Sequence, residues 1–229
     1  MRFASLLLSA FILGAGSVHA LEFRVISWSG ALTNLRYENA GRSVALLADE
    51  GVLSESYSLR TGGILELYRE VGPDGHKTRE TVAKLSPPER LEQAILVLAP
   101  LDAAGSGYTG LWIDDSPTAR PVNHLAFRNL SSHAVALKVG GDEFNLAPQG
   151  GRQLVFDPTK RSLPLKLAAQ AGAGWTLVAT QPQTVRQGYR ILVLLRDGRI
   201  NQEDGSFRPV DLVTIFDRMP VASLTGDGR

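Results

Sequence analysis

The chain has 229 residues, of which 44% are hydrophobic, and its 24 Lys and Arg residues nearly balance its 23 Asp and Glu residues. A chain with this much apolar content and this little net charge is folded rather than disordered. The balanced charge gives no electrostatic reason to expect a nucleic acid as partner. The absence of cysteine excludes disulfide frameworks, cysteine-based zinc sites, iron–sulfur clusters and thiol nucleophiles.

The first twenty residues have the parts of a secretory signal peptide. A positively charged start precedes the apolar residues 3–13, and Val18-His19-Ala20 places small residues where a signal peptidase cleaves. The apolar run is too short to span a bilayer, which needs about 20 residues. We therefore expect residues 1–20 to be a signal peptide and the protein to be exported, to the periplasm or out of the cell, with no stable membrane insertion after cleavage.

The sequence resembles itself at an offset of 96 residues. Residues 82–98 align without a gap with residues 178–194, and both stretches end in Ile-Leu-Val-Leu. Weaker similarities flank this match: residues 35–39 resemble 125–129, residues 59–68 resemble 146–156, and Ile113-Asp114-Asp115 resembles Ile215-Phe216-Asp217. The conserved order predicts a tandem duplication with its seam near residues 121–123.

Each copy consists of short apolar stretches separated by turn residues. The predicted strands of the first copy are residues 44–47, 57–59, 64–68, 81–85 and 94–98, and those of the second are 134–139, 144–146, 153–156, 163–167, 175–179 and 190–195. About seven short strands in 100 residues are typical of a β-sandwich. The alternative is a short helix in residues 86–93, where Ser86 would be the N-cap and Pro87 the first residue. Residues 165–171 are a weaker helix candidate.

We therefore predict an all-β protein with little helix, made of two tandem immunoglobulin-like β-sandwich modules. The expected boundaries are 1–20 for the signal peptide, 21–122 and 123–220 for the modules, and 221–229 for a flexible tail. The run Phe127-Arg128-Asn129-Leu130, followed by Val139-Gly140-Gly141, Leu146 and Gly150-Gly151, resembles the tandem immunoglobulin-like modules of secreted bacterial proteins of unknown function. That resemblance implies the sandwich fold and carries no functional residues.

Residues 140–144 (Gly-Gly-Asp-Glu-Phe) spell the signature of the bacterial diguanylate cyclases. The resemblance would imply a hairpin at these residues, whose acidic side chains help to hold metal and GTP as they do in that family. The family's upstream metal-binding Asp and its other motifs have no counterpart before Gly140, and a nucleotide substrate conflicts with export. The interpretation from the residues alone is a tight glycine turn with solvated Asp142 and Glu143 and an inward-facing Phe144.

No metal or catalytic site emerges from the pattern. His76, His124 and His133 lack the spacing of ligands on one strand or helix, and residues 201–205 resemble a hairpin loop more than a calcium loop. The glycine-rich residues 105–110 fit neither a phosphate loop nor a nucleophile elbow. Asp114 and Asp115 are expected to be solvated at a strand end. We therefore predict no catalytic residues, no metal and no cofactor, and the binding residues remain unknown.

The three tryptophans are the remaining indication of binding. Core packing is the expected role of each, because a buried indole supplies a large apolar area. Trp28, flanked by Ser27, Ser29 and Gly30, is the best candidate for an exposed stacking residue.

The function predicted from the sequence is a non-catalytic binding or structural module that contacts protein or envelope polysaccharide. One alternative is a glycan-acting hydrolase in which Asp114, Asp115 or Glu143 meet between the modules. The other is an assembly factor that works by strand addition at a sheet edge.

Overall fold

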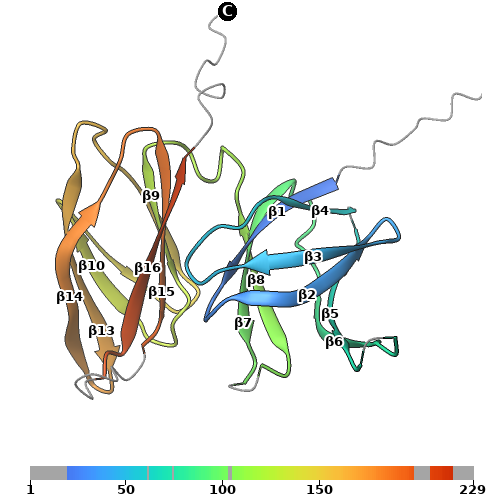
Figure 1. The fold of residues 1–229 in the computed structure, drawn as a ribbon. Coiled ribbons are helices and arrows are strands. Elements are labelled where there is room, and N and C mark those ends of the chain that lie inside the picture. The colour runs from blue at the N-terminus through green and yellow to red at the C-terminus, as the bar shows by residue number, and fades with distance from the viewer. Residues whose placement is uncertain (1–19, 61, 74, 103–104, 199–206, 219–229) are drawn as a thin grey trace, which may run out of the picture.

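The computed structural model describes residues 20–60, 62–73, 75–102, 105–198 and 207–218, and in these residues the chain forms β-strands and no helix (Figure 1). The prediction of an all-β protein is confirmed. The predicted signal peptide up to residue 19, the calcium-like residues 201–205 and the predicted tail lie outside the described residues.

The first eight strands form two four-stranded sheets, with strand orders β4-β1-β7-β8 and β3-β2-β5-β6. Their bounds are β1 Ala20–Ser27, β2 Leu32–Asn39, β3 Arg42–Ala48, β4 Tyr57–Arg60, β5 Leu65–Val71, β6 Thr78–Leu85, β7 Gln93–Pro100 and β8 Tyr108–Asp114.

The last eight strands form a second pair of sheets, with strand orders β12-β9-β15-β16 and β11-β10-β13-β14. Their bounds are β9 His124–Asn129, β10 Val135–Val139, β11 Asp142–Leu146, β12 Gly151–Val155, β13 Ser162–Ala171, β14 Gly174–Thr184, β15 Tyr189–Asp197 and β16 Val210–Arg218.

The second half repeats the topology of the first strand by strand. Adding eight to each strand number of the first pair of sheets gives the strand orders of the second pair. Even the parallel pairing recurs, between β1 and β7 and between β9 and β15. The internal repeat and the β-sandwich architecture are therefore present, and we call the two units module 1 (β1–β8) and module 2 (β9–β16).

Each module has its own core between its two sheets. In β1, Leu21, Phe23 and Val25 are buried in the core of module 1 while Glu22 is exposed; in β9, Leu125 and Phe127 are buried in the core of module 2. This alternation is the period of two that a strand with one face on a core requires. Burying each such side chain contributes about 1.5–3 kcal/mol relative to leaving it exposed.

The two modules contact each other through equivalent sheets. β7 and β15 are apolar on both faces, because one face of each packs on the core of its own module and the outward side chains meet those of the other module. The buried residues of this third cluster, the inter-module cluster, are Ile26, Ile95, Val97, Ile113, Leu192, Leu194 and Ile215. Sheet β4-β1-β7-β8 therefore packs against sheet β12-β9-β15-β16, and the other sheet of each module faces outward.

The predicted equivalence of the Ile-Leu-Val-Leu runs is wrong by one residue. Ile95 pairs with Ile113, and Leu192 pairs with Ile215; all four belong to the inter-module cluster. The equivalent positions on β7 and β15 thus differ by 97 (192 − 95), not by 96. A shift of one residue reverses the face of every side chain in a strand, and Ile191 indeed lies in the core of module 2.

Two of the flanking similarities also join strands that are not equivalent. Residues 35–39 belong to β2, whereas 125–129 belong to β9, the counterpart of β1. Leu59 belongs to β4, whereas Leu146 belongs to β11. Only the similarity between residues 113–115 and 215–217 joins true counterparts, the ends of β8 and β16.

The two helix candidates are wrong as well. Residues 86–92 form turns and extended backbone, with Arg90 at a φ of 69°, and Gln93 begins β7. A helix of so few residues has too few hydrogen bonds to offset its nucleation cost. Residues 165–171 belong to β13, where Leu165 and Leu167 face the core on alternate positions.

The residues that spell the cyclase signature form an ordinary hairpin between β10 and β11. Gly140 has a φ of 61°, which a tight turn needs and glycine readily adopts. Glu143 is exposed and pairs with Lys138 of the neighbouring strand. Phe144 packs against the core of module 2, with its ring centroid 5.6 Å from that of Phe127. The interpretation of residues 140–144 as a tight turn with an inward-facing Phe144 is confirmed.

Candidate functional site

The three acids considered for a hydrolase are not brought together. Asp114 and Asp115 lie at the end of β8 beside the inter-module contact, whereas Glu143 lies on β11 in the outward sheet of module 2. The expectation that Asp115 is solvated is wrong, because it is only 4% exposed. Its carboxylate instead belongs to a buried ion cluster.

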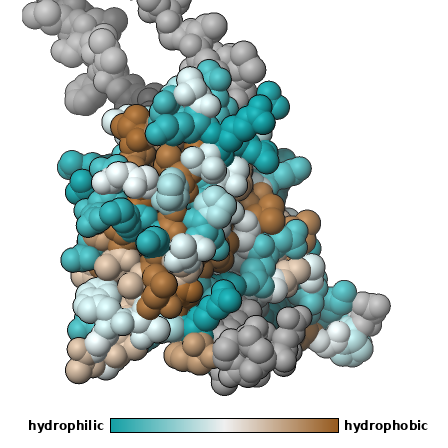
Figure 2. All heavy atoms as spheres, turned by 90° about the vertical axis from the view of Figure 1, so that its left-hand side faces the viewer, coloured by the Kyte–Doolittle hydropathy of each residue, from teal (hydrophilic) through white to brown (hydrophobic). Residues whose placement is uncertain are grey.

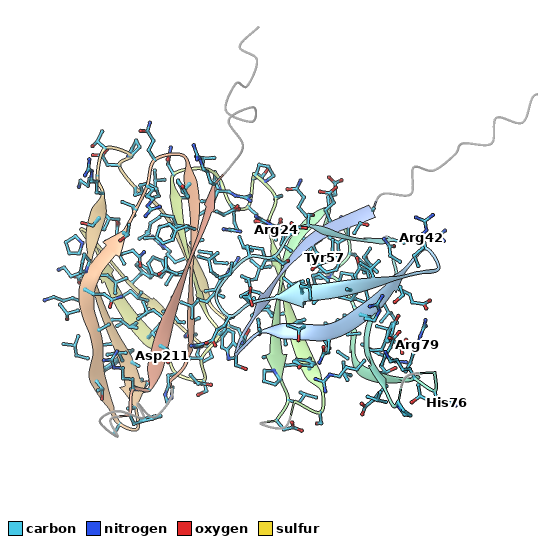
Figure 3. The ribbon with its side chains drawn as sticks, in the orientation of Figure 1. Arg24, Arg42, Tyr57, His76, Arg79 and Asp211 are labelled. Atoms are coloured by element: carbon cyan, nitrogen blue, oxygen red, sulfur yellow. The ribbon has the colours of Figure 1, made fainter. Side chains whose placement is uncertain are left out.

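That ion cluster contains Arg24, Asp115, Arg120, Arg190 and Asp217, drawn from both modules and the connector between them. Asp115 accepts hydrogen bonds from Arg24 and Arg120, each at 2.5 Å. Asp217 accepts two from Arg24, at 2.7 and 2.8 Å, and two from Arg190, through Nε at 3.0 Å and through Nη2. Figure 3 shows Arg24 at the junction of the modules. The cluster therefore binds the two modules to each other by charge-assisted hydrogen bonds.

Arginine side chains bond both carboxylates of the ion cluster and favour the ionised form of Asp217. Burial alone would raise the pKa of Asp217, but the hydrogen bonds and charges of Arg24 and Arg190 outweigh burial and lower that pKa to about 2. Burial likewise works against the charge of Arg24, yet Asp217 and Asp115 raise its pKa overall. A carboxylate held ionised in this way is a poor general acid, which disfavours acid catalysis by Asp217.

The sequence carried a signal for this cluster. Asp115 and Asp217 each lie two residues after an isoleucine of the inter-module cluster, Ile113 and Ile215, and so face the same contact. Duplicated acids at the ends of equivalent strands therefore meet across the contact. Arg24 and Arg190 had no such repeated pattern and were not singled out.

Two of the three tryptophans do not lie where the sequence suggested. Trp112 packs in the core of module 1, 5.5 Å from the Phe23 ring, as expected. Trp28 is half-buried and packs against the inter-module cluster, so it is not the exposed stacking residue. Trp175 is 52% exposed, and core packing was the wrong prediction for it.

Trp175 lies on β14, which ends its sheet. It pairs with Gln170 of β13, and Leu177 pairs with Ala168. Because Ala169 is fully buried in the core, its neighbours Ala168 and Gln170 face outward, and so do their partners. Trp175 and Leu177, the latter 64% exposed, thus stand side by side on the outer face of module 2. Figure 2 looks at this side and shows hydrophobic residues interrupting the hydrophilic surface.

β14 also differs from the other edge strands in charge. It is the longest strand among the described residues, and of the eight strands at sheet edges it alone contains no Asp, Glu, Lys or Arg. Its counterpart β6 carries Arg79, Glu80 and Lys84. Arg79 pairs with Glu38 of β2, which lies in the same sheet. Charged side chains on an edge strand discourage pairing with another chain, and β14 lacks that protection.

The three histidines among the described residues stay apart. His76 lies in the turn between β5 and β6, His124 begins β9, and His133 lies before β10 with Nδ1 2.9 Å from the Gln170 carbonyl oxygen. Within the described ranges, no group of three His, Asp or Glu side chains is placed to hold a metal ion. The same residues contain no helix long and apolar enough to cross a membrane.

Compared with known proteins, the sequence matches no protein-family model, and a search of curated proteins finds no match either.

Proposed function

We propose that this protein is an exported, non-catalytic binding module that contacts another protein of the cell envelope through β14. The observation that carries the proposal is the combination of an uncharged edge and two exposed apolar side chains, Trp175 and Leu177, on the longest strand. Export rests on the signal-peptide pattern of the first twenty residues.

An extended polypeptide segment suits this edge better than a folded surface does. One side of β14 pairs with β13, and no strand among the described residues pairs with the other side. In an edge strand, half of the backbone N–H and C=O groups point away from the sheet and can bond an added strand. Trp175 and Leu177 would then contact alternate side chains of the added segment.

Only part of β14 can pair with an added strand. Pro182 has no N–H group to donate to an added strand, so pairing is restricted to the part of β14 before it. A bulge lies opposite Leu167 and Ala168, which adds local twist. We expect the partner segment to pair with only a few residues around Trp175 and Leu177.

Envelope polysaccharide is the second candidate ligand. The exposed indole of Trp175 supports it, because sugar rings stack on aromatic faces and Trp175 is the tryptophan that the fold leaves most open. Strand addition needs the backbone edge, whereas stacking needs only the indole, so the two candidates respond differently to substitution.

Affinity capture from the envelope fraction of the source organism tests the proposal. The bait is the mature protein, and the variants are Leu177→Lys and Trp175→Lys. Val155→Lys is the matched control, because Val155 is 73% exposed and lies on β12, another edge strand of module 2. Each eluate is divided and one half is treated with protease before the bound material is identified.

The proposal expects one protein to be captured by the unmodified bait and by Val155→Lys, and to be lost with both β14 variants. A protease-resistant glycan that is lost with Trp175→Lys and retained with Leu177→Lys would establish the second candidate instead. Capture that survives both β14 substitutions would overturn the assignment of binding to this strand.

A further inference from the structure

Arg120 is the most incompletely bonded charged side chain of the inter-module contact. It lies in the connector between β8 and β9, its side chain is 4% exposed, and its Nη1 donates to Asp115. Its Nε and Nη2 groups are buried and have no hydrogen-bond acceptor among the described residues. A buried donor without an acceptor is costly, and native proteins usually supply a partner from protein, water or ligand.

The ion cluster also contains one more cation than anion. Arg24, Arg120 and Arg190 share two carboxylates, those of Asp115 and Asp217. Burial lowers the pKa of Arg120, and the nearby charge of Arg190 lowers it further, against the attraction of Asp115. The charge missing from this cluster is therefore negative.

Arg120 lines a pocket at the rim of the contact. The pocket has a volume of about 180 Å³, and its polar lining consists of Arg120, Arg128, Arg152 and Gln153. That volume is many times the roughly 10–15 Å³ that a cavity needs, by the same measure, to hold one water molecule. Arg128 on β9 and Arg152 on β12 are exposed, so the pocket can be reached from solvent. Gln153 donates to the Ala119 carbonyl oxygen at 3.2 Å and fixes the connector beside it.

Gly151 makes room for one of these arginines. It pairs with Arg128 across β9 and β12, and a Cβ atom at Gly151 would lie 2.9 Å from Arg128 Cζ and closer still to Nη1. The φ of Gly151 is not in the left-handed region, so the backbone itself does not require glycine there. The absence of a side chain lets the Arg128 guanidinium lie across β12 at the pocket.

We propose that this pocket is a binding site for a compact oxyanion, a carboxylate or a phosphate group. The unbonded N–H groups of Arg120 and the guanidinium group of Arg128 supply donors suited to two-oxygen recognition, whereas the guanidinium of Arg152 lies over the Phe144 ring. The anion would also balance the third arginine of the ion cluster. This site is separate from β14 and does not depend on the function proposed for that strand.

Titration of the ¹⁵N-labelled mature protein, followed by nuclear magnetic resonance, tests the proposal. The probes are inorganic phosphate, acetate and glucuronate at constant ionic strength, with chloride as the reference anion. Saturable shifts are expected for the Arg120 Nε–H signal and for the amides of Gly151 and Gln153. Comparing acetate with glucuronate separates a free carboxylate from one carried on a sugar, and phosphate tests the other oxyanion.

Two variants connect the shifts to the pocket without disturbing buried groups. Arg128→Gln removes an exposed guanidinium, and Gly151→Ala displaces it; both are expected to weaken binding about tenfold or more, the scale of one lost charged hydrogen bond. Arg42→Gln is the matched control, since Arg42 is exposed on β3 far from the junction (Figure 3). Leu177→Lys should bind the anion unchanged, which distinguishes this site from the β14 proposal.

Saturable binding of either oxyanion that is weakened by both pocket variants and unaffected by Arg42→Gln supports the site. Shifts that grow linearly with concentration, or binding that Arg128→Gln and Gly151→Ala leave unchanged, would overturn it.

Discussion

Charged side chains usually face water and apolar side chains usually face the core, and two regions of this molecule depart from that rule. The contact between the modules buries charges, whereas the β14 edge exposes apolar side chains. At the contact, Asp115 and Asp217 are buried with arginines from both modules. On β14, Trp175 and Leu177 are exposed on a strand without charge. The buried charges of the first exception are largely paired with one another, whereas Trp175 and Leu177 remain exposed among the residues that the structure describes. The difference separates a closed structural contact from an open surface.

β14 and its counterpart β6 differ in charge although the repeat places them at equivalent edges. Both strands occupy the same edge in their modules, yet β6 is charged and β14 is not. Because the fold is the same at both edges, the fold alone does not explain the missing charges. The partner proposed for β14 would explain them.

The largest effect on stability is expected from breaking the ion cluster. Asp115→Ala leaves Arg120 and Arg190 buried without the carboxylate they share, and loss of one partner from a buried ion pair costs about 3–5 kcal/mol. Urea unfolding measures the free energy of unfolding. Glu143→Ala is the control, because it removes an exposed acid that pairs with Lys138, and it should leave the free energy of unfolding unchanged. Equal effects of the two substitutions would mean that the cluster does not hold the modules together.

A smaller effect is expected from acid. The folded pKa of Asp217 is lowered to about 2 from an ordinary 3.8, so the unfolded state takes up its proton first as the pH falls. The stabilisation by Asp217 is complete above about pH 5 and is lost as the pH falls through 4 toward 2, a loss of about 2 kcal/mol. Unfolding measured between pH 6 and 2 should show this slope, and Asp217→Asn should flatten it. An unchanged slope in Asp217→Asn would contradict the assignment.

Substitution on the open edge should change binding and barely change stability. Leu177→Lys replaces a side chain that is 64% exposed, and such surface changes are usually within about 0.5 kcal/mol. We expect an unfolding midpoint close to that of the unmodified protein, together with loss of the partner. A large loss of stability would show that Leu177 packs within the fold.

The smallest change to the folded monomer is expected from making β6 resemble β14. The double substitution Arg79→Thr and Glu80→Val removes two exposed charges, including the Arg79–Glu38 ion pair. The monomer should unfold as before, since exposed ion pairs contribute little. Its edge, which then carries Lys84 alone as a charged residue, should promote self-association, detectable by sedimentation velocity. A variant that stays monomeric at high concentration would show that these charges do not protect β6.

The sequence was informative about strands and much less so about faces and edges. Apolar alternation and turn residues located most of the strands, because those signals are local, but the predicted ranges left out β1, β2 and β9. The alignment of Ile95 with Ile191 failed because identical apolar residues do not reveal which face of a sheet their side chains lie on. Only the pairing of β7 with β8 and of β15 with β16 decides that. The repeated topology was predictable, whereas the residue-by-residue equivalence was not.

The candidate sites depend on contacts between distant segments. Asp115 looked like a solvated acid because its arginine partners lie up to 91 residues away along the chain. Trp175 looked like a core residue because nothing local indicates that its side chain lies on the outer face of the sheet. The repeat of Asp115 as Asp217 was the one available signal for the ion cluster, since it placed two acids at equivalent strand ends.

Photo-crosslinking in the source organism tests the assignment of β14 most directly. A photoreactive amino acid is placed at Thr180, exposed on β14, and in a second strain at Thr81, exposed on β6. We predict that position 180 crosslinks to a single envelope protein, that Leu177→Lys in the same chain abolishes the crosslink, and that position 81 gives none. The same crosslink from both positions, or none from position 180 while the protein is exported and folded, would contradict the account.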